Sequence, residues 1–444
     1  MLIIQKNING FEVKERQYWD MDFPQDAERD DTKPPEYHIK QVKDQLMEAV
    51  AFRLEADVPV GCYLSGGIDS CSMLGLASSM QQSPVKAFTI SFDHDDYDES
   101  AIARQMADAA NADQEEIRLS ATELYGFNYF KTLYHAERTF YNTLGVAKWC
   151  MSKRVNECGY RVVVTGEGSD ELFGGYPAFK RDYLKHAYEN EPERLLQMDA
   201  SNAIFKGAIL AETPVTHPAL EAVCGFTPSW IQSWIQTLDI ARPLLHGDLL
   251  AELKHYDPIE AIADSFDKAQ LDGRHVLDKA QYTWIKTMLD CQILNWGGDR
   301  VDMANSMESR PAFLDHHVAE MAKNIPPHLR IHGNTEKWVL REAMKNILPD
   351  VLYKREKFAF MAPPAHTSDH KKQALEQLTD RFLSMEKIKE AGIFDLHRLK
   401  RFLLEYEHDK NPVSLVRKDA LLNHILGLHI LHEQFIEAKV LSEA

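Results

Sequence analysis

A short glycine-rich turn holds the first residues of this chain that could do chemistry. Residues 61–70 read Gly-Cys-Tyr-Leu-Ser-Gly-Gly-Ile-Asp-Ser, so an apolar run ends at Ser65, Gly66 and Gly67. Two adjacent glycines let backbone N–H groups approach a phosphate closely, and the N-terminus of the helix expected next would face the same anion. Asp69 follows where a magnesium ion between phosphates needs an oxygen ligand. Because no lysine follows the glycines, the turn differs from the phosphate loop of kinases and GTPases.

A second glycine-rich loop weakens the alternative interpretation, which is an ordinary strand-to-helix turn. Residues 166–176 read Gly-Glu-Gly-Ser-Asp-Glu-Leu-Phe-Gly-Gly-Tyr and directly follow an apolar strand predicted over 161–165. A solvated loop can hold three acids, but it rarely also holds four glycines directly after a buried strand. In α/β sheets, ligands bind in loops that follow the strands. The two loops together therefore favour a ligand site.

The segments around the loops predict the scaffold that must position them. Apolar runs indicate strands over 58–64, 85–91, 116–119 and 161–165. Helical segments alternate with these strands, a pattern typical of an α/β fold with a doubly wound parallel sheet. The pattern becomes largely helical in the C-terminal part of the chain.

Composition limits the functions that this chain can have. The 444 residues include 50 Lys and Arg but 68 Asp and Glu, a net charge of −18 that argues against a nucleic-acid partner. No apolar run reaches membrane-spanning length, and no signal peptide is expected at Met1. The six cysteines lack metal-binding spacing, so we expect them to be reduced and buried in a cytoplasmic protein.

Both loops resemble those of the asparagine synthetase family, whose synthetase domain is an ATP pyrophosphatase of the adenine nucleotide α-hydrolase-like type. The resemblance continues in family order through four further blocks, 87–99, 299–315, 337–349 and 355–363. It implies a synthetase-like domain over 38–365, in which the helical segment 190–290 is acceptor-specific. An arm or linker over 1–37 and a helical extension over 366–444 would flank this domain. From the residues alone, the aromatic side chains of 190–290 are interpreted as core.

The resemblance also assigns roles to individual residues. The implied pyrophosphate-binding residues are Ser65, Gly66, Gly67, Asp69 and Ser70. The implied magnesium ligands are Asp69 and Asp170. The backbone groups implied to hold adenine belong to Leu64, Ile90, Thr165 and Gly166. The implied catalytic residues are Glu167 and Lys337, with Lys357 as a further cation at the phosphates. Helix capping by the Asp and Ser side chains, and a solvated position for Lys337, are the structural alternatives.

The implied activity is ATP-dependent amide formation by a carbon–nitrogen ligase. A carboxylate is adenylated with release of pyrophosphate, ammonia or an amine then attacks the acyl-adenylate, and ATP and Mg²⁺ are the implied cofactors. Glu167 favours amidation of the asparagine synthetase type, since β-lactam-forming relatives carry Tyr there. One alternative is a natural-product amide ligase or a macrolactam or peptide cyclase that joins a substrate amine. Others are a non-catalytic nucleotide-binding subunit and a tRNA-modifying ATP pyrophosphatase, which the acidic composition disfavours.

Two departures from the family pattern concern the substrates and partners. Full-length asparagine synthetases begin with Met-Cys, whereas residue 2 is Leu, and the arm ending at residue 20 resembles the family's interdomain linker. We therefore expect no glutaminase domain, nitrogen from ammonia, a separate glutaminase subunit or an amine, and a partner surface within 1–35 for a hetero- or homo-oligomer. Segment 142–147 lacks the acid, Ser/Thr pair and proline that bind the family's acceptor. The expected acceptor is thus either aspartate or another small-molecule or peptide carboxylate.

Overall fold

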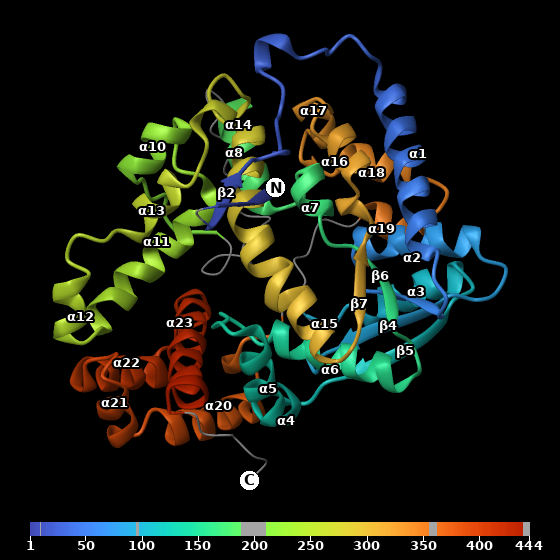
Figure 1. Cartoon of the computed structure of the whole chain (residues 1–444). Coiled ribbons are helices and arrows are strands. Elements are labelled where there is room, and N and C mark those ends of the chain that lie inside the picture. The colour runs from blue at the N-terminus through green and yellow to red at the C-terminus, as the bar shows by residue number, and fades with distance from the viewer. Residues whose placement is uncertain (9, 95–96, 188–209, 355–361, 438–444) are drawn as a thin grey trace.

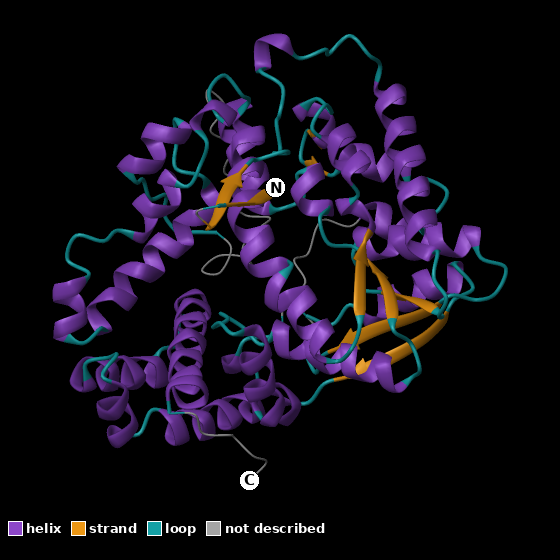
Figure 2. Cartoon of the chain, in the orientation of Figure 1, coloured by secondary structure: helices purple, strands orange, loops and turns teal. Residues whose placement is uncertain are grey.

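The fold is built on a parallel sheet whose strands lie far apart in the sequence. The computed structural model describes residues 1–8, 10–94, 97–187, 210–354 and 362–437. Within this part of the chain, five parallel strands form one sheet in the order β5-β4-β3-β6-β7, which Figure 2 shows at one side of a largely helical molecule. Their bounds are β3 (Val60–Tyr63), β4 (Lys86–Ser91), β5 (Asp113–Arg118), β6 (Val162–Thr165) and β7 (Glu308–Pro311).

The strand order determines which helices cover which face of the sheet. Strands β3, β4 and β5 are neighbours in chain order, so right-handed crossovers place α2 (Ile68–Met80) and α3 (Ser100–Ala109) on the same face. The chain then returns past β3 to β6, which places α6 (Leu144–Glu157) on the opposite face, against β4. Helix α1 (Pro35–Leu54) packs beside α2, as Figure 1 shows. The predicted doubly wound α/β fold is therefore confirmed.

The rest of the described chain is mainly helical, as predicted. After β5 and β6 come α4 (Ala121–Tyr125), α5 (Phe127–Ala136), α7 (Ser169–Phe173) and α8 (Pro177–Ala187). The described part of 190–290 forms α10 (Pro218–Cys224), α11 (Ser229–Ala241), α12 (Gly247–Glu252), α13 (Pro258–Asp264), α14 (Val276–Trp284) and the start of a π-helical stretch, η5 (Ile285–Ile293) and η6 (Asn295–Asp299). Then follow α15 (Arg300–Ala304), α16 (His316–Ala322), α17 (Pro327–Arg330), β8 (Ile331–His332), β9 (Thr335–Glu336), α18 (Trp338–Ala343) and α19 (Asp350–Lys354). The C-terminal helices are α20 (Asp369–Phe382), α21 (Met385–Ala391), α22 (Leu396–His408) and α23 (Pro412–Leu431). None of the helices in the described ranges is long and apolar enough to cross a bilayer.

The reversal of strand order at β3 creates the place for a ligand site. From β3 the sheet continues through β4 and β5 on one side and through β6 and β7 on the other. At such a reversal, the loops that follow the two central strands leave the sheet in opposite directions, and ligands bind in the crevice between them. Those loops here begin at residues 64 and 166, which are the starts of the two glycine-rich segments.

Three details differ from the sequence-based expectations. Strand β5 begins at Asp113, three residues before the strand predicted over 116–119, and β7 was not predicted because it is a short, polar edge strand. All six cysteines are free thiols, but only Cys62, Cys71 and Cys224 are buried as expected. Cys150 and Cys158 are half-buried and Cys291 is exposed.

The N-terminal arm carries a small hairpin of its own. Strands β1 (Leu2–Asn7) and β2 (Gly10–Glu15) pair antiparallel, and all their described residues are exposed. The exposed side chains include Ile4 and Phe11, which are 58% and 70% accessible. Two-stranded hairpins are marginally stable alone in water, and this hairpin leaves its apolar side chains exposed, whereas Met21 and Phe23 further along the arm are buried in the core.

A buried carboxylate joins helices α8 and α11. Asp182 of α8 accepts hydrogen bonds from the backbone N–H and the hydroxyl of Ser229, at 2.9 and 2.5 Å, at the first residue of α11. Asp182 is 4% exposed. Burial raises the pKa of Asp182 to about 6, although the bonds from Ser229 oppose the rise.

We predict that Asp182 makes stability fall as the pH rises from about 4 to 6. In this range the unfolded chain, with a pKa of 3.8, loses its proton before the folded protein does, so the folded state is progressively penalised. The free energy of unfolding of Asp182→Asn relative to the wild type should therefore rise by on the order of 2 kcal/mol between about pH 4.5 and 7.5, measured by urea denaturation. Asn replacement of the exposed Asp239 in α11 is the matched control. An unchanged difference across this range would contradict the prediction.

Candidate active site

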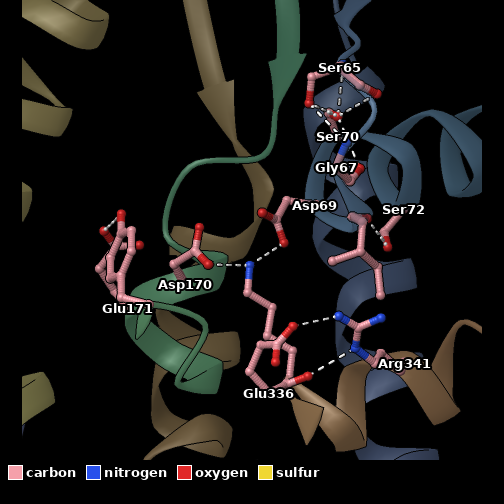
Figure 3. Close-up of polar contacts among 12 residues, drawn as sticks. Ser65, Gly67, Asp69, Ser70, Ser72, Asp170, Glu171, Glu336 and Arg341 are labelled. Atoms are coloured by element: carbon pink, nitrogen blue, oxygen red, sulfur yellow. Dashed lines mark hydrogen bonds and ion pairs between the residues drawn. The ribbon is translucent and has the colours of Figure 1, made fainter. Parts of the chain in front are cut away.

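The turn after β3 is closed by its own hydroxyl groups. Ser65 donates its backbone N–H to the Ser70 hydroxyl at 2.9 Å, and the Gly67 N–H bonds to the Ser65 hydroxyl at 3.2 Å. The N–H of Gly66 bonds to Glu99 at 3.2 Å. A phosphate in this turn would therefore replace the Ser65 hydroxyl and Glu99 as acceptors. The polar contacts of this turn appear in Figure 3.

The second loop packs directly on the first. A Cβ on Gly166 would lie 2.9 Å from the backbone nitrogen of Ser70 and 3.1 Å from the Cβ of Asp69. Such distances leave no room for a side chain, so a glycine at this position allows the two loops to touch. The sequence predicted one site from two distant segments, and this contact brings them together.

A buried lysine joins the acids of the two loops. The ammonium of Lys337 lies 2.5 Å from Asp69 and 2.6 Å from Asp170, and its side chain is fully buried. Figure 3 shows the two carboxylates approaching this nitrogen from the first turns of two helices, α2 and α7. A buried charge is tolerated when oppositely charged groups surround it, which both carboxylates do here. Lys337 is therefore a member of the site, not the solvated helix residue of the alternative interpretation.

The segment that carries Lys337 is itself held by ion pairs. Lys337 adopts a left-handed conformation, with φ of 53°, between β9 and α18. The neighbouring Glu336 accepts from Arg341 at 2.9 Å and lies 3.6 Å from Lys180 of α8. These buried pairs fix the backbone from which the lysine side chain reaches the two loops.

The two aspartates are suited to a magnesium ion. Their Oδ1 atoms converge on one cationic nitrogen, and carboxylate oxygens are ligands that Mg²⁺ prefers. Mg²⁺ usually takes one or two protein carboxylates and completes its shell with phosphates and water. Consistent with this, the described residues contain no group of three or more His, Cys, Asp or Glu arranged to hold a metal by themselves.

Glu167 has a partner that sequence analysis missed. Its carboxylate accepts from Lys148 of α6 at 2.8 Å. Burial would raise the pKa of Glu167, but the charge and hydrogen bond of Lys148 hold that pKa below its usual range. Lys148 also lies 4.6 Å from the centre of the Tyr63 ring, at the end of β3. No local sequence pattern distinguishes Lys148 from a surface lysine, because its partner Glu167 lies in a different segment of the chain.

A cavity of about 210 Å³ connects these groups. The predicted site residues that line it are Leu64, Ser65, Gly67, Asp69, Ser70, Ile90, Gly166, Glu167 and Asp170. Lys337 lies against Asp69 and Asp170, and Gly66 is within the turn, whereas Thr165 belongs to the buried end of β6. Lys357 lies outside the described residues.

The cavity has a second, apolar boundary, of which Trp284 belongs to the aromatic side chains that the sequence analysis interpreted as core. Its residues, which we call the apolar wall, are Tyr141, Leu144, Trp284, Met288, Ile293 and Trp296. Glu171 closes the cavity beside this wall and accepts from Tyr176 at 2.8 Å and from Trp284 at 3.1 Å. Burial raises the pKa of Glu171 to about 7.

Known proteins resemble the chain over most of its length. A family model described as asparagine synthase matches residues 41–432. Amidase chyE of Penicillium rubens is 33% identical over 79% of this chain and 56% of its own length. Amidase chry2 of Gibberella zeae is 32% identical over 78% of this chain and 55% of its own length. Glutamine-hydrolyzing asparagine synthetase 1 of Bacillus subtilis is 29% identical over 74% of this chain and 50% of its own length. The chain thus spans about half the length of these curated relatives.

We predict that a single methyl group at Gly175 disrupts the charged cluster. A Cβ there would lie 2.0 Å from both Asp170 Oδ1 and Lys337 Cε, so the cluster must move. Gly175→Ala should weaken binding of Mg-ATP by about 10-fold or more, because such overpacking typically costs about 1–3 kcal/mol. Isothermal titration calorimetry measures the effect. The control is Gly247→Ala, where a Cβ meets nothing within 4 Å. Wild-type affinity in Gly175→Ala would contradict this description of the site.

Proposed function

The chain belongs to the asparagine synthase family, and we propose that it is an ATP-dependent amide synthetase that forms AMP and pyrophosphate. The observation that carries this proposal is the convergence of Asp69, Asp170 and Lys337 within 2.6 Å, in the crevice between the loops after β3 and β6. Two carboxylates for a metal and one buried cation are the groups that transfer at a phosphate requires.

The first step is adenylation of a carboxylate. One carboxylate oxygen attacks the α-phosphorus of ATP, and the bond from that phosphorus to the bridging oxygen of pyrophosphate breaks. Mg²⁺ held by Asp69 and Asp170 would neutralise charge on the leaving pyrophosphate. Lys337 offers a second, fixed positive charge for the phosphate oxygens, and its burial strengthens that interaction. Ser65, Gly66, Gly67 and Ser70 present the hydroxyls and N–H groups of the turn, and backbone atoms of Leu64, Ile90, Thr165 and Gly166 hold adenine.

The second step is attack by nitrogen. A nitrogen lone pair attacks the acyl carbon, the bond from that carbon to AMP breaks, and the nitrogen loses a proton. Glu167 borders the cavity and is held ionised by Lys148, so it can accept the proton that the nitrogen of ammonia loses when it attacks. The proton passes from nitrogen to a carboxylate oxygen of Glu167, and no other reactant is needed.

Ammonia is our proposed nitrogen donor, supplied from solution or by a glutaminase partner. The exposed apolar side chains of the β1–β2 hairpin, among them Ile4 and Phe11, support a docking role for the N-terminal arm, because exposed apolar side chains gather at interaction sites. An amine within the substrate, as in a cyclase or natural-product ligase, is the alternative.

Product identification tests this proposal. Purified protein is supplied with Mg-ATP and a panel of carboxylates, with ammonium, with glutamine or without a nitrogen source. The proposal requires AMP and pyrophosphate with at least one carboxylate and an amide when ammonium is present. Turnover without added nitrogen would favour the substrate-amine alternative, and loss of glutamine-dependent turnover with a glutaminase after deletion of the β1–β2 hairpin, while ammonium-dependent turnover remains, would support the docking role. Formation of ADP and phosphate would contradict the proposal.

We predict that Glu167 acts on the nitrogen step. Glu167→Gln should slow amide formation by on the order of 10²–10⁴-fold, the usual effect of removing a positioned base, while pyrophosphate release changes little. Pre-steady-state quench experiments separate the two steps. An equal loss in both would contradict this role.

Lys148 provides a second test, because it holds the pKa of Glu167 low. In Lys148→Met, burial acts on Glu167 without the opposing charge and hydrogen bond of Lys148, so the pKa of Glu167 should rise and the acid limb of the amide-formation profile should move to higher pH. The matched control is Lys153→Met, the same substitution at an exposed position of the same helix. An acid limb that stays in place in Lys148→Met would show that the ion pair does not tune the base.

A further inference from the structure

The apolar wall faces the same cavity as the phosphate turn and Glu167. Its residues come from α6, the segment before α6, the end of α14 and the π-helical stretch. When the carboxylate of an acceptor is adenylated in this cavity, the rest of the acceptor must lie in the same cavity. The composition of the wall therefore carries information about the acceptor.

The wall is fixed in place before any substrate binds. Trp296 is 3% exposed and contacts Tyr141 with ring centres 5.6 Å apart and planes at 84°. A Cβ on Gly145 would lie 2.6 Å from the Trp296 ring, so the absence of a side chain there lets the ring lie on α6. Trp284 contacts Tyr176 with ring centres 4.4 Å apart. Aromatic faces held in this way provide flat, preorganised apolar surface.

The π-helical stretch explains how one segment contributes so much of this surface. The N–H of Leu294 bonds to the carbonyl of Leu289, and that of Asp299 to Leu294, both at 2.9 Å and five residues apart. The wider turn places Met288, Ile293 and Trp296 on the cavity side together. Such irregular helices occur frequently at functional sites.

The cations at the cavity are already paired. The cation among its described lining residues is Lys148, which pairs with Glu167, and the adjacent Lys337 pairs with Asp69 and Asp170. A second carboxylate on an acceptor would therefore find only paired cations among the described residues around the cavity. Burying an unpaired anion is costly, so the cavity selects against it.

From these observations we infer that the acceptor is a monocarboxylate on a flat aromatic body, with no second anionic group. The apolar wall binds the ring, and the carboxylate points toward the phosphate turn. Aspartate, which carries a second carboxylate and no apolar body, is excluded as the preferred acceptor. This inference rests on the proposed amide synthetase function and names its substrate class.

Carboxylate-dependent exchange of labelled pyrophosphate into ATP tests the inference on the wild-type chain. The probes are benzoate, phenylacetate, isophthalate and aspartate. We expect kcat/KM for benzoate or phenylacetate to exceed that for isophthalate and aspartate by about 10²-fold or more, because the second carboxylate stays unpaired. Exchange with aspartate but with neither aromatic monocarboxylate would overturn this inference and leave the proposed function standing. Exchange with none of the four would count against the proposed function itself.

A substitution that adds a charge to the apolar wall tests the inference through substrate selectivity, which a simple loss of folded protein would not change. Met288 lines the cavity and is partly buried, so it can be replaced without opening the core. Met288→Lys should lower the ratio of kcat/KM for benzoate to kcat/KM for isophthalate by about 10-fold or more, since the new cation pairs with the second carboxylate of isophthalate. Met288→Gln, which adds polarity without charge, should keep the preference. Unchanged selectivity in Met288→Lys would overturn the placement of the acceptor on this wall.

Discussion

The site depends on one buried ammonium group and the two carboxylates that neutralise it. Lys337 has no access to water, so its charge is stable only while Asp69 and Asp170 remain beside it. These residues come from three distant parts of the chain. Folding must therefore bring the loop after β3, the loop after β6 and the turn before α18 together before the lysine can be buried. The same groups that satisfy this requirement are the groups that phosphate chemistry needs.

The sheet topology makes this convergence geometrically simple. Strand order reverses at β3, so the loops after β3 and β6 border one crevice. Glycines at positions 166 and 175 allow the chain to pass close to the charged groups, where any side chain would collide with them. Helix α6, on the opposite face, then supplies Lys148 and Leu144 of the apolar wall. In our proposal, phosphate chemistry and acceptor recognition therefore use different segments of the fold.

Much of this could be predicted from the sequence, because the two loops are local patterns that follow recognisable strands. The doubly wound sheet, the turn at Ser65 and the acids at 167 and 170 all follow from such patterns. Strand β7 could not be predicted, since its sequence is polar and its pairing with β6 joins residues far apart in the chain. The partnership of Lys148 with Glu167 and the cavity-facing position of Trp296 depend on packing between helices. A buried aromatic residue and an aromatic residue of a binding site have the same local sequence signal.

The most direct test of the central claim follows one oxygen atom. The claim is that a substrate carboxylate attacks the α-phosphorus of ATP in the crevice formed by Asp69, Asp170 and Lys337. An acceptor carboxylate labelled with ¹⁸O is turned over with Mg-ATP and ammonium, and the products are analysed by ³¹P NMR. The account predicts one labelled oxygen in the phosphate of AMP and none in pyrophosphate. Label in inorganic phosphate beside ADP, or AMP that carries solvent oxygen alone, would contradict it.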